Sequence, residues 1–391
     1  MLTTSFPSYK GDVKAPFIYA LCKALTKQGA KIDVVSSADG KSKLEEEYDG
    51  ISIHRFHYFF PHKLQRLTKD GGIPQNLKES FLAKLQFPLY SLKLFLRSMK
   101  YAKKSDIIHC QWSYSALIGV FLKKMYKKPL MMTERGSSAN IALKNALMRK
   151  VLLYVLKHCD VITANNQHQL KDFLKLGVQR EKLYHTPNGI NMQLFKPKGK
   201  KESRAKLKLI KNKKILLYVG RLVKVKGPDY FLEAMKELVK KRKGVHCYII
   251  GDGRWEKKLK EYVKLNNLRD VVTFLGAKPL QTIPDYINAA DFLVLPSLAE
   301  GKPNAVGEAF ACGVPVIASD IPGSREYFSF FPYGLLTPAK DAKKLAQTIE
   351  KAFMKNWKTK TFTTQHTKFR KKYTWEYSAR ECVKLYKKLL H

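Results

Sequence analysis

The chain has 391 residues, of which 45% are hydrophobic, 73 are Lys or Arg and 32 are Asp or Glu. This length exceeds what one hydrophobic core normally serves, so two domains are expected, and no apolar run reaches the roughly 20 residues of a membrane-spanning helix. The formal net charge of +41 carries no information on fold, but it narrows the partners to nucleic acid, anionic lipid or an anionic substrate, unless it only reflects lysines spread over solvated helix faces.

The chain opens on MLTTSFPS, which has neither the basic start nor the long apolar stretch of a signal peptide. Its first residues have the pattern of a strand end, so either the chain start is misplaced or this strand is short. A helix that Gly29 ends follows, and alternating apolar residues then indicate strands. The elements expected in this part are a strand, a helix and two strands, at residues 1–6, 17–29, 31–37 and 50–61.

Residues 77–104 have Leu, Phe and Tyr at helical spacing with basic residues between them. We expect a helix here, interrupted at Pro88 because proline removes a backbone donor. A basic, aromatic-rich amphipathic helix can lie on an anionic membrane surface. The same pattern also fits a core helix that packs on the sheet and exposes a lysine face, and both interpretations stay open.

Polar side chains follow two buried strands in this half of the chain. The strand expected at 105–112 contains His109 and Gln111, and the next places Glu134 and Arg135 after PLMMT. Carboxyl ends of parallel strands share one edge of a sheet, where ligands bind. A basic side chain at that edge suits a phosphate or carboxylate. His109 fits equally well as a hydrogen-bonded histidine of the core.

The second half opens with a strand that ends in a basic loop. A charged run at 196–212 is expected to be a solvated, mobile linker. The strand ILLYVG follows it, and its loop carries Arg221 and Lys226 ahead of a helix that begins at Pro228. Two cations before a helix N-terminus can hold a diphosphate without a metal. The loop lacks the GxxxxGK[ST] pattern of a P-loop.

The most informative stretch runs from residue 292 to 326, FLVLPSLAEGKPNAVGEAFACGVPVIASDIPGSRE. Its pattern predicts a buried strand, a loop, a short helix from Asn304 to Ala311 and a second buried strand. Glu300 lies in the loop and Glu308 on the helix. Carboxylates at such a strand end can bind sugar and ribose hydroxyls, although a helix start also attracts carboxylates through its dipole.

The pattern Glu300-Gly301-x-Pro303-Asn304-x-x-x-Glu308, followed by GVPVIASDIPGSRE, resembles the nucleotide-sugar glycosyltransferases of family 4. The resemblance implies the α/β GT-B fold, in which two doubly wound, Rossmann-like domains face a cleft and the C-terminal helix crosses back to the first domain. PNGIN at 187–191 matches the domain-linking signature of that family. The expected division is an acceptor domain, a linker, a donor domain and a returning helix, at 1–195, 196–212, 213–372 and 373–391.

The resemblance also assigns roles to individual residues. Glu300 would lie beside the donor sugar, Glu308 would hold the ribose, and Arg221 and Lys226 would neutralise the leaving diphosphate. The other donor-binding positions implied are Gly251, Gly253, Lys278, Gly301, Lys302, Pro303 and Asn304. Those implied at the acceptor or in the cleft are Gly11, His109, Gln111 and Arg135, where Gln111 and Arg135 replace histidines that many relatives carry.

The implied reaction is retaining transfer of a hexose from a nucleoside diphosphate sugar, with a UDP-sugar favoured and GDP-mannose the alternative. No second carboxylate flanking the anomeric carbon is identified, which favours a front-face route over double displacement. We expect no metal or other cofactor and no nucleic-acid partner. The basic surface favours a lipid-linked or other envelope glycan as acceptor, which places the enzyme in polysaccharide biosynthesis, in the cytoplasm or peripherally on the inner face of the membrane.

Two other functions compete with this prediction. A nucleotide-sugar epimerase of the same fold is disfavoured by the EGKPN…E pattern, and a non-catalytic basic protein on a membrane is disfavoured because Arg221, Lys226 and Glu300 are all present. The six cysteines stand singly without CxxC spacing, which favours buried free thiols in a reducing cytoplasm over a zinc site.

Overall fold

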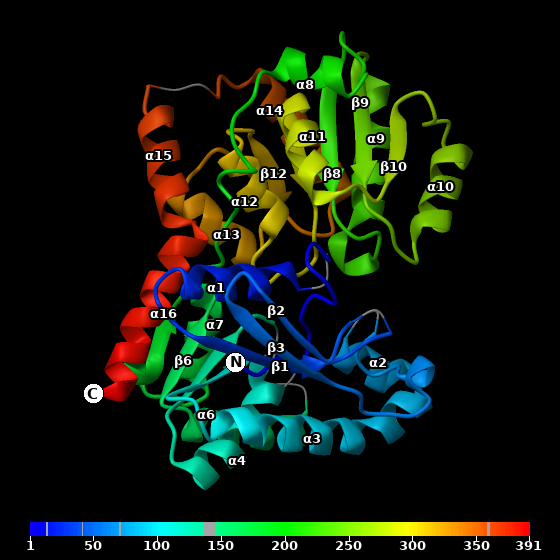
Figure 1. The fold of residues 1–391 in the computed structure, drawn as a ribbon. Coiled ribbons are helices and arrows are strands. Elements are labelled where there is room, and N and C mark those ends of the chain that lie inside the picture. Colours follow the sequence, from blue (N-terminus) through cyan, green and yellow to red (C-terminus); the bar gives the residue numbers. More distant parts are fainter. Residues whose placement is uncertain (13–14, 41, 70–71, 137–141, 143–144, 358–359) are drawn as a thin grey trace. The chain divides into compact units, whose positions relative to one another are not determined.

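The computed structural model describes the chain except residues 13–14, 41, 70–71, 137–141, 143–144 and 358–359 (Figure 1). It divides into two compact units, each described here by itself. Unit 1 consists of Met1–Gly189 and Trp375–His391, and unit 2 of Ile190–Thr374. Two residues of the loop expected before the first helix, 13 and 14, lie outside the described residues.

Unit 1 alternates strands and helices. Its described elements in chain order are α1 (Pro16–Thr26), β1 (Ile32–Ser37), β2 (Glu45–Tyr48), β3 (Ile51–Phe56), η1 (His62–Leu64), α2 (Ile73–Glu79), α3 (Phe81–Ala102), β4 (Ile108–Gln111), α4 (Trp112–Tyr126), β5 (Leu130–Glu134), α6 (Ala146–His158), β6 (Val161–Ala164), α7 (Gln167–Lys175), η2 (Arg180–Lys182), β7 (Leu183–His185) and α16 (Trp375–Leu390).

The start of the chain joins the two halves of the unit 1 sheet. Strands β4, β5, β6 and β7 pair in parallel in that order, and β1 pairs in parallel with β3, which the short β2 borders. Leu2 lies between the halves, where it forms parallel bridges with Val35 and Cys110. The backbone of residues 1–3 bonds to both neighbours, so the expected strand end at 1–6 is a single central bridge.

The last helix closes the core of unit 1. Leu21 and Leu25 of α1 pack with Ala379, Cys382 and Leu385 of α16 in one buried cluster. The apolar positions of α16 recur at helical spacing, so one stripe of the helix is buried. The C-terminal helix therefore returns to the first unit. The cysteines are all free and buried.

Helix α3 differs from the expectation of an interruption at Pro88. It runs unbroken from Phe81 to Ala102 with Pro88 inside it. The break lies at Ser80, whose side chain accepts a hydrogen bond from the Ala83 amide at 3.3 Å and so caps α3. Pro88 is exposed, so the carbonyl that loses its helical partner can bond to water, and burial of Tyr90 and Leu94 offsets the lost bond.

Unit 2 is built on one fully parallel sheet. Its strands lie in the order β10-β9-β8-β11-β12-β13, so chain order reverses between β8 and β11. The described elements are α8 (Lys200–Lys206), β8 (Lys214–Val219), η3 (Lys224–Lys226), α9 (Pro228–Lys241), β9 (Val245–Ile250), α10 (Glu256–Leu265), β10 (Val272–Gly276), η4 (Leu280–Thr282), α11 (Ile283–Ala289), β11 (Phe292–Leu295), α12 (Asn304–Ala311), β12 (Val316–Ser319), α13 (Pro322–Phe330), β13 (Gly334–Thr337), α14 (Ala342–Met354) and α15 (Phe362–Lys372).

The expected linker at 196–212 belongs instead to unit 2 and contains α8. Arg204 is buried, and its guanidinium donates to the Ala289 carbonyl at 2.9 Å and to Asp291 at 2.8 Å. Lys198 and Lys206 both pair with Asp285. The run is largely exposed, as its composition suggested. It is not a mobile linker, however, because these cations meet carboxylates distant in sequence and fix the run on α11.

Candidate active site

The loops after β8 and β11 meet at the carboxyl edge of the unit 2 sheet. These strands are neighbours at the point where chain order reverses, which is where ligands bind in open parallel sheets. The Leu298 amide donates to the Val225 carbonyl at 2.8 Å. Gly227 has φ +64°, and a Cβ there would lie 2.1 Å from the Pro296 carbonyl oxygen. Only glycine therefore allows this close packing of the two loops.

Lys226 and Glu300 form an ion pair between these loops. The Ser297 hydroxyl also donates to the Glu300 carboxylate, at 2.9 Å. The side chains of Lys226 and Glu300 are 23% and 10% exposed, so both charges are partly desolvated while remaining open to a ligand. The pair places one cation and one hydrogen-bond acceptor side by side at the switch point.

The Tyr218 side chain hydrogen-bonds to the backbone of the loop that carries Arg221 and Lys226. Its buried hydroxyl donates to the Arg221 carbonyl at 3.2 Å and approaches the Lys226 carbonyl at 3.4 Å. Burial raises the pKa of this phenol well above its usual range. The Arg221 side chain is exposed and forms no ion pair with any described residue, so a positive charge remains for an anion.

Glu308 lies in the middle of α12 and is half-buried. Burial raises the pKa of its carboxyl to about 7, because a charge there loses hydration without gaining a compensating cation. A carboxyl group held in this way can bind hydroxyl groups of a ligand. Asn304 is the exposed first residue of the same helix, after Pro303, so the expected helix from 304 to 311 is confirmed.

The Lys302 side chain is buried and unavailable to a donor, so the expected donor contact at this position stays a prediction for its backbone N–H. It is 0% exposed, and its ammonium pairs with Glu326 at 2.6 Å. The ammonium also lies 4.7 Å from the ring centre of Tyr327 and 4.5 Å from that of Tyr373. Burial lowers its pKa to about 8. Motif position suggested a ligand contact, but the aromatic surroundings and Glu326 draw the side chain inward.

Gly251 and Gly253 serve the packing of one loop on another. A Cβ on Gly251 would lie 2.0 Å from the Gly220 carbonyl oxygen, and one on Gly253 would lie 2.6 Å from that of Leu222. The Leu222 amide also bonds to the Asp252 carbonyl. These contacts require glycine at both positions, and the expected approach of a ligand to this backbone stays a prediction. They hold the loop after β9 beside the Arg221 loop.

Lys278 and Gly301 complete the expected donor positions. Gly301 follows Glu300 directly in the loop, and a Cβ on Gly323 would lie 2.7 Å from its carbonyl oxygen. Lys278 is half-buried in the loop after the edge strand β10, which β9 and β8 separate from β11. No contact among the described residues joins Lys278 to the Lys226–Glu300 pair.

In unit 1, His109 belongs to the core. Its Nδ1 lies 2.6 Å from the Tyr386 hydroxyl and its Nε2 lies 2.7 Å from the Thr133 hydroxyl. Burial keeps its pKa well below the usual range, so the ring is neutral. Both nitrogens are occupied, and the expected contact with an acceptor is therefore wrong for this residue.

Gln111 and Arg135 form a second polar group at the carboxyl edge of unit 1. Arg135 Nε donates to the Gln111 side-chain oxygen at 2.7 Å, and the guanidinium also bonds to Asn188. Phe17 lies under the guanidinium at 5.5 Å. Burial lowers the Arg135 pKa to about 10, and the two oxygens that hold it are uncharged amides. The arginine is thus oriented without being neutralised by them.

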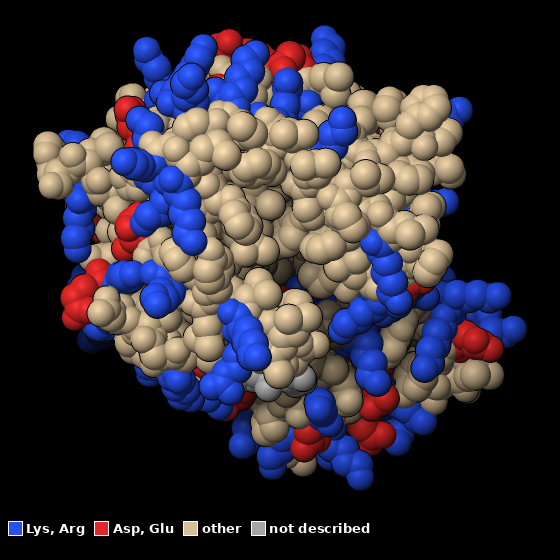
Figure 2. Space-filling view, turned by 90° about the horizontal axis from the view of Figure 1, so that it is seen from below, with Lys and Arg blue, Asp and Glu red and all other residues tan. Residues whose placement is uncertain are grey.

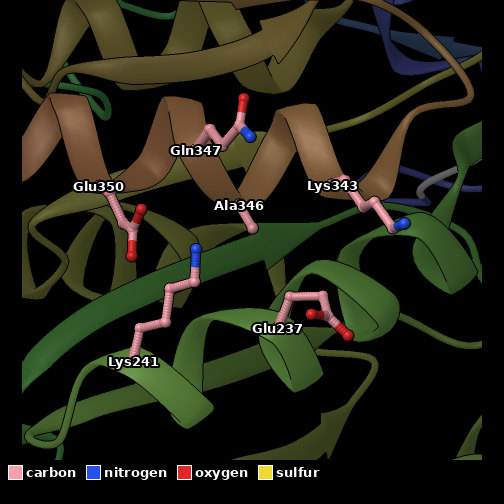
Figure 3. A pocket seen from close by; sticks show the side chains of 6 residues that line it. All are labelled: Glu237, Lys241, Lys343, Ala346, Gln347 and Glu350. Carbon is pink, nitrogen blue, oxygen red and sulfur yellow. The ribbon is translucent and has the colours of Figure 1, made fainter.

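Two features remain to be described, namely Gly11 in unit 1 and a surface pocket in unit 2. Gly11 has φ +97° and a Cβ there would meet nothing within 4 Å. The positive φ accounts for a glycine here, and its expected place near the acceptor stays a prediction. The pocket lies between α9 and α14 (Figure 3) and none of the candidate site residues lines it. The residues that line it are Glu237, Lys241, Lys343, Ala346, Gln347 and Glu350.

Sequence reasoning missed the residues that support the site. Ser297 and Tyr218 bond to the Glu300 and Lys226 loops, and Glu326 holds Lys302. Ser297 lies three residues before Glu300 and Tyr218 lies three residues before Arg221, so this short spacing was the available signal for both. The contact of Glu326 with Lys302 joins positions 24 residues apart, which a linear pattern does not show.

Each unit is a largely parallel α/β domain of Rossmann type, and two such domains in one chain are the parts of a GT-B fold. The family model "Glycosyl transferases group 1" matches residues 199–369, and "Glycosyltransferase Family 4" matches residues 15–194. The two matches cover nearly the whole chain. The protein therefore belongs to the glycosyltransferases of family 4 and is an enzyme of this type.

Individual relatives agree with this assignment. The chain is 30% identical over 264 residues to the UDP-Gal:alpha-D-GlcNAc-diphosphoundecaprenol alpha-1,3-galactosyltransferase of Escherichia coli, which is 65% of this chain and 66% of that protein. Two solved structures share the fold. Sucrose-phosphate synthase of Thermosynechococcus elongatus has a TM-score of 0.79 at 22% identity, over 99% of this chain and 98% of the other. HepE of Anabaena, in complex with UDP-glucose, has a TM-score of 0.75 at 19% identity, over 99% of both chains.

Proposed function

We propose that the protein transfers a hexose, with retention of configuration, from a nucleoside diphosphate sugar to a lipid-linked acceptor of an envelope glycan. The observation that carries the proposal is the Lys226–Glu300 pair at the strand-order reversal of unit 2, with the exposed Arg221 in the same loop as Lys226. Together, these residues offer positive charge for a diphosphate and a hydrogen-bond acceptor for sugar hydroxyls.

Each side chain has a defined task in this proposal. Arg221 and Lys226 bind the diphosphate and stabilise the negative charge that grows as it leaves. Glu300 accepts hydrogen bonds from the sugar and fixes its orientation, and Glu308 binds the ribose. When donor binds, Lys226 exchanges its carboxylate partner for the diphosphate. Because the two cations balance the negative charge of the leaving diphosphate, the proposal includes no metal.

A retaining, front-face course is compatible with how Glu300 is held. Ser297 donates a hydrogen bond to its carboxylate and can keep doing so after Lys226 has turned to the diphosphate, which suits a hydrogen-bond acceptor better than a nucleophile. A front-face route needs no enzyme nucleophile. The leaving diphosphate, held by the two cations, then stays on the face from which the acceptor hydroxyl attacks.

Donor and acceptor classes are supported by named relatives. HepE of Anabaena has been crystallised with UDP-glucose, and the Escherichia coli relative is named for a UDP-galactose donor and a diphosphoundecaprenol-linked acceptor. We favour a UDP-sugar over GDP-mannose on this basis. The acceptor would be presented at the cytoplasmic face of a membrane. Arg135, held by neutral amides in unit 1, would bind an anionic group of the acceptor.

Isothermal titration with a panel of nucleoside diphosphate sugars tests the donor assignment. We expect one UDP-sugar to bind selectively, with the affinity reduced at least tenfold by Arg221→Ala and by Glu308→Ala. Lys241→Ala, which changes a lysine on α9 beside the pocket of Figure 3, is the matched control and should bind as the unmodified protein does. Binding that survives both site variants would refute the proposed donor site.

A further inference from the structure

Helix α3 is apolar on two opposite faces. One face, with Ala83, Tyr90 and Leu94, is buried in the core of unit 1. The other face carries a stripe of large apolar side chains that project into solvent. Its members and their exposed fractions are Phe81 75%, Leu85 56%, Leu89 44%, Leu92 52% and Leu96 50%.

The stripe has the spacing of a single helix face. Its members follow one another at intervals of four, four, three and four residues, so they fall on one side of an α-helix. At a rise of about 1.5 Å per residue the stripe is roughly 22 Å long. The interpretation of residues 77–104 as a core helix is therefore confirmed for one face, and the membrane interpretation stays a prediction for the other. Exposed apolar residues are normal when scattered, but a continuous row marks an interaction surface.

Neighbouring helices enlarge this surface. Phe121 and Met125 lie one turn apart on α4 and are 48% and 49% exposed. Leu147 and Met148 at the start of α6 are 65% and 41% exposed. Helix α4 packs against both α3 and α6. The three helices lie at the bottom of Figure 1, and Figure 2 shows that side, where Lys and Arg border an area without charged side chains.

The charge around the stripe has one sign. No acidic residue occurs from Phe81 to Lys104. At the helical period Lys84 falls on one side of the stripe, and Lys93 and Lys100 fall on the other. None of these lysines forms an ion pair with a described residue, whereas Arg97, nearer the core face, pairs with Glu45. Long basic side chains beside protruding apolar ones are typical of helices that lie in a membrane interface.

We propose that α3, with the adjoining parts of α4 and α6, docks the protein on an anionic lipid bilayer, with the leucine stripe inserted between lipids and the lysines on their phosphates. A second copy of this chain fits the surface poorly, because +41 on each copy opposes pairing of two lysine-bordered faces. A bilayer rich in anionic lipid supplies both the apolar phase and the opposite charge. No helix among the described residues has the length and hydropathy to cross the bilayer, and interfacial docking requires none.

Co-sedimentation of the full chain with vesicles tests this surface. Vesicles of phosphatidylcholine alone are compared with vesicles containing phosphatidylglycerol, at low and high salt. We expect binding to the anionic vesicles that weakens at high salt. Leu85→Gln/Leu92→Gln should reduce it at least fivefold, and Leu265→Gln should not. Leu265 is the matched control, because it is an exposed leucine (74%) at the end of α10 in unit 2.

These experiments can distinguish failure of the docking proposal from failure of the proposed function. The docking proposal rests on the proposed function only in assuming that the acceptor is held in a membrane. Both altered leucines are solvent-exposed, so the double variant should fold and bind nucleotide sugar unchanged, as circular dichroism and titration would verify. No vesicle binding at low salt, or equal binding by the double variant, would overturn the docking surface while leaving donor binding intact. Dimerisation that the double variant abolishes, without vesicle binding, would assign the stripe to a second copy and equally overturn it.

Discussion

Removing the Lys302 ammonium should destabilise unit 2 and loosen its donor loop. Lys302→Met leaves Glu326, which is 12% exposed, without its buried partner. Breaking one side of a buried ion pair costs about 3–5 kcal/mol. Unit 2 spans Ile190–Thr374, and for a domain of that size 1 kcal/mol corresponds to about 2–4 °C in Tm. The expected fall in the unit 2 transition is therefore roughly 6–20 °C by these two relations.

The double variant Lys302→Met/Glu326→Gln separates this role from a direct ligand contact. Methionine between Tyr327 and Tyr373 keeps favourable sulfur–aromatic packing, and no charge stays buried without a partner. Most of the lost stability should therefore return, and donor affinity should return with it. Arg325→Met, which removes an exposed pair with Asp320 on α13, is the control and should leave Tm unchanged.

Calorimetry and nucleotide-sugar titration of the three variants decide the question. The reasoning fails if Lys302→Met unfolds like the unmodified protein. It also fails if donor affinity is lost at full stability and the double variant does not restore it, because Lys302 would then contact the donor as the motif first suggested. Recovery of both quantities together supports a positioning role.

Three further predictions concern individual groups. The Glu308 carboxyl has a pKa raised to about 7 by burial, so its carboxylate forms as pH rises from 6 to 8; donor affinity should strengthen over that range, and a Glu308→Gln variant that keeps the pH dependence would contradict the ribose role. The same raised pKa means that the folded state binds more protons than the unfolded state between about pH 4.5 and 7, so this group's contribution to stability falls as pH rises through that window. Gly227→Ala forces a Cβ to 2.1 Å from the Pro296 carbonyl at φ +64°, and should lower stability measurably and donor affinity at least tenfold, whereas Gly29→Ala, also at positive φ but with open space around it, should leave donor affinity unchanged. Arg135→Gln should reduce transfer to an anionic acceptor at least tenfold while donor titration is unaffected, and equal loss with an uncharged acceptor would argue against an anion contact.

The local patterns of the chain were sufficient for much of the fold. Apolar runs such as FLVL and VIAS are buried strands β11 and β12, and the helix from Asn304 to Ala311 has the predicted bounds. Such elements can be predicted from short stretches of sequence, because the spacing of apolar residues differs between strands and helices. The family motif likewise located Lys226 and Glu300, which the folded loops bring into contact.

The roles of buried polar groups were decided only by tertiary structure. Lys302 lies inside the recognised motif, yet Glu326 and two tyrosines from distant segments turn it inward. His109 lies within the expected strand, and its ring finds partners in Thr133 and Tyr386. The charged run at 196–212 is largely exposed, as its composition suggested, but Asp285 and Asp291 anchor it. In each case the deciding partner is far away in sequence, and the free energy of burying a charge or an imidazole depends on that partner. The sequence by itself determined the strands, the helices and the motif, and the packed structure determined which of their polar side chains remain open to a ligand.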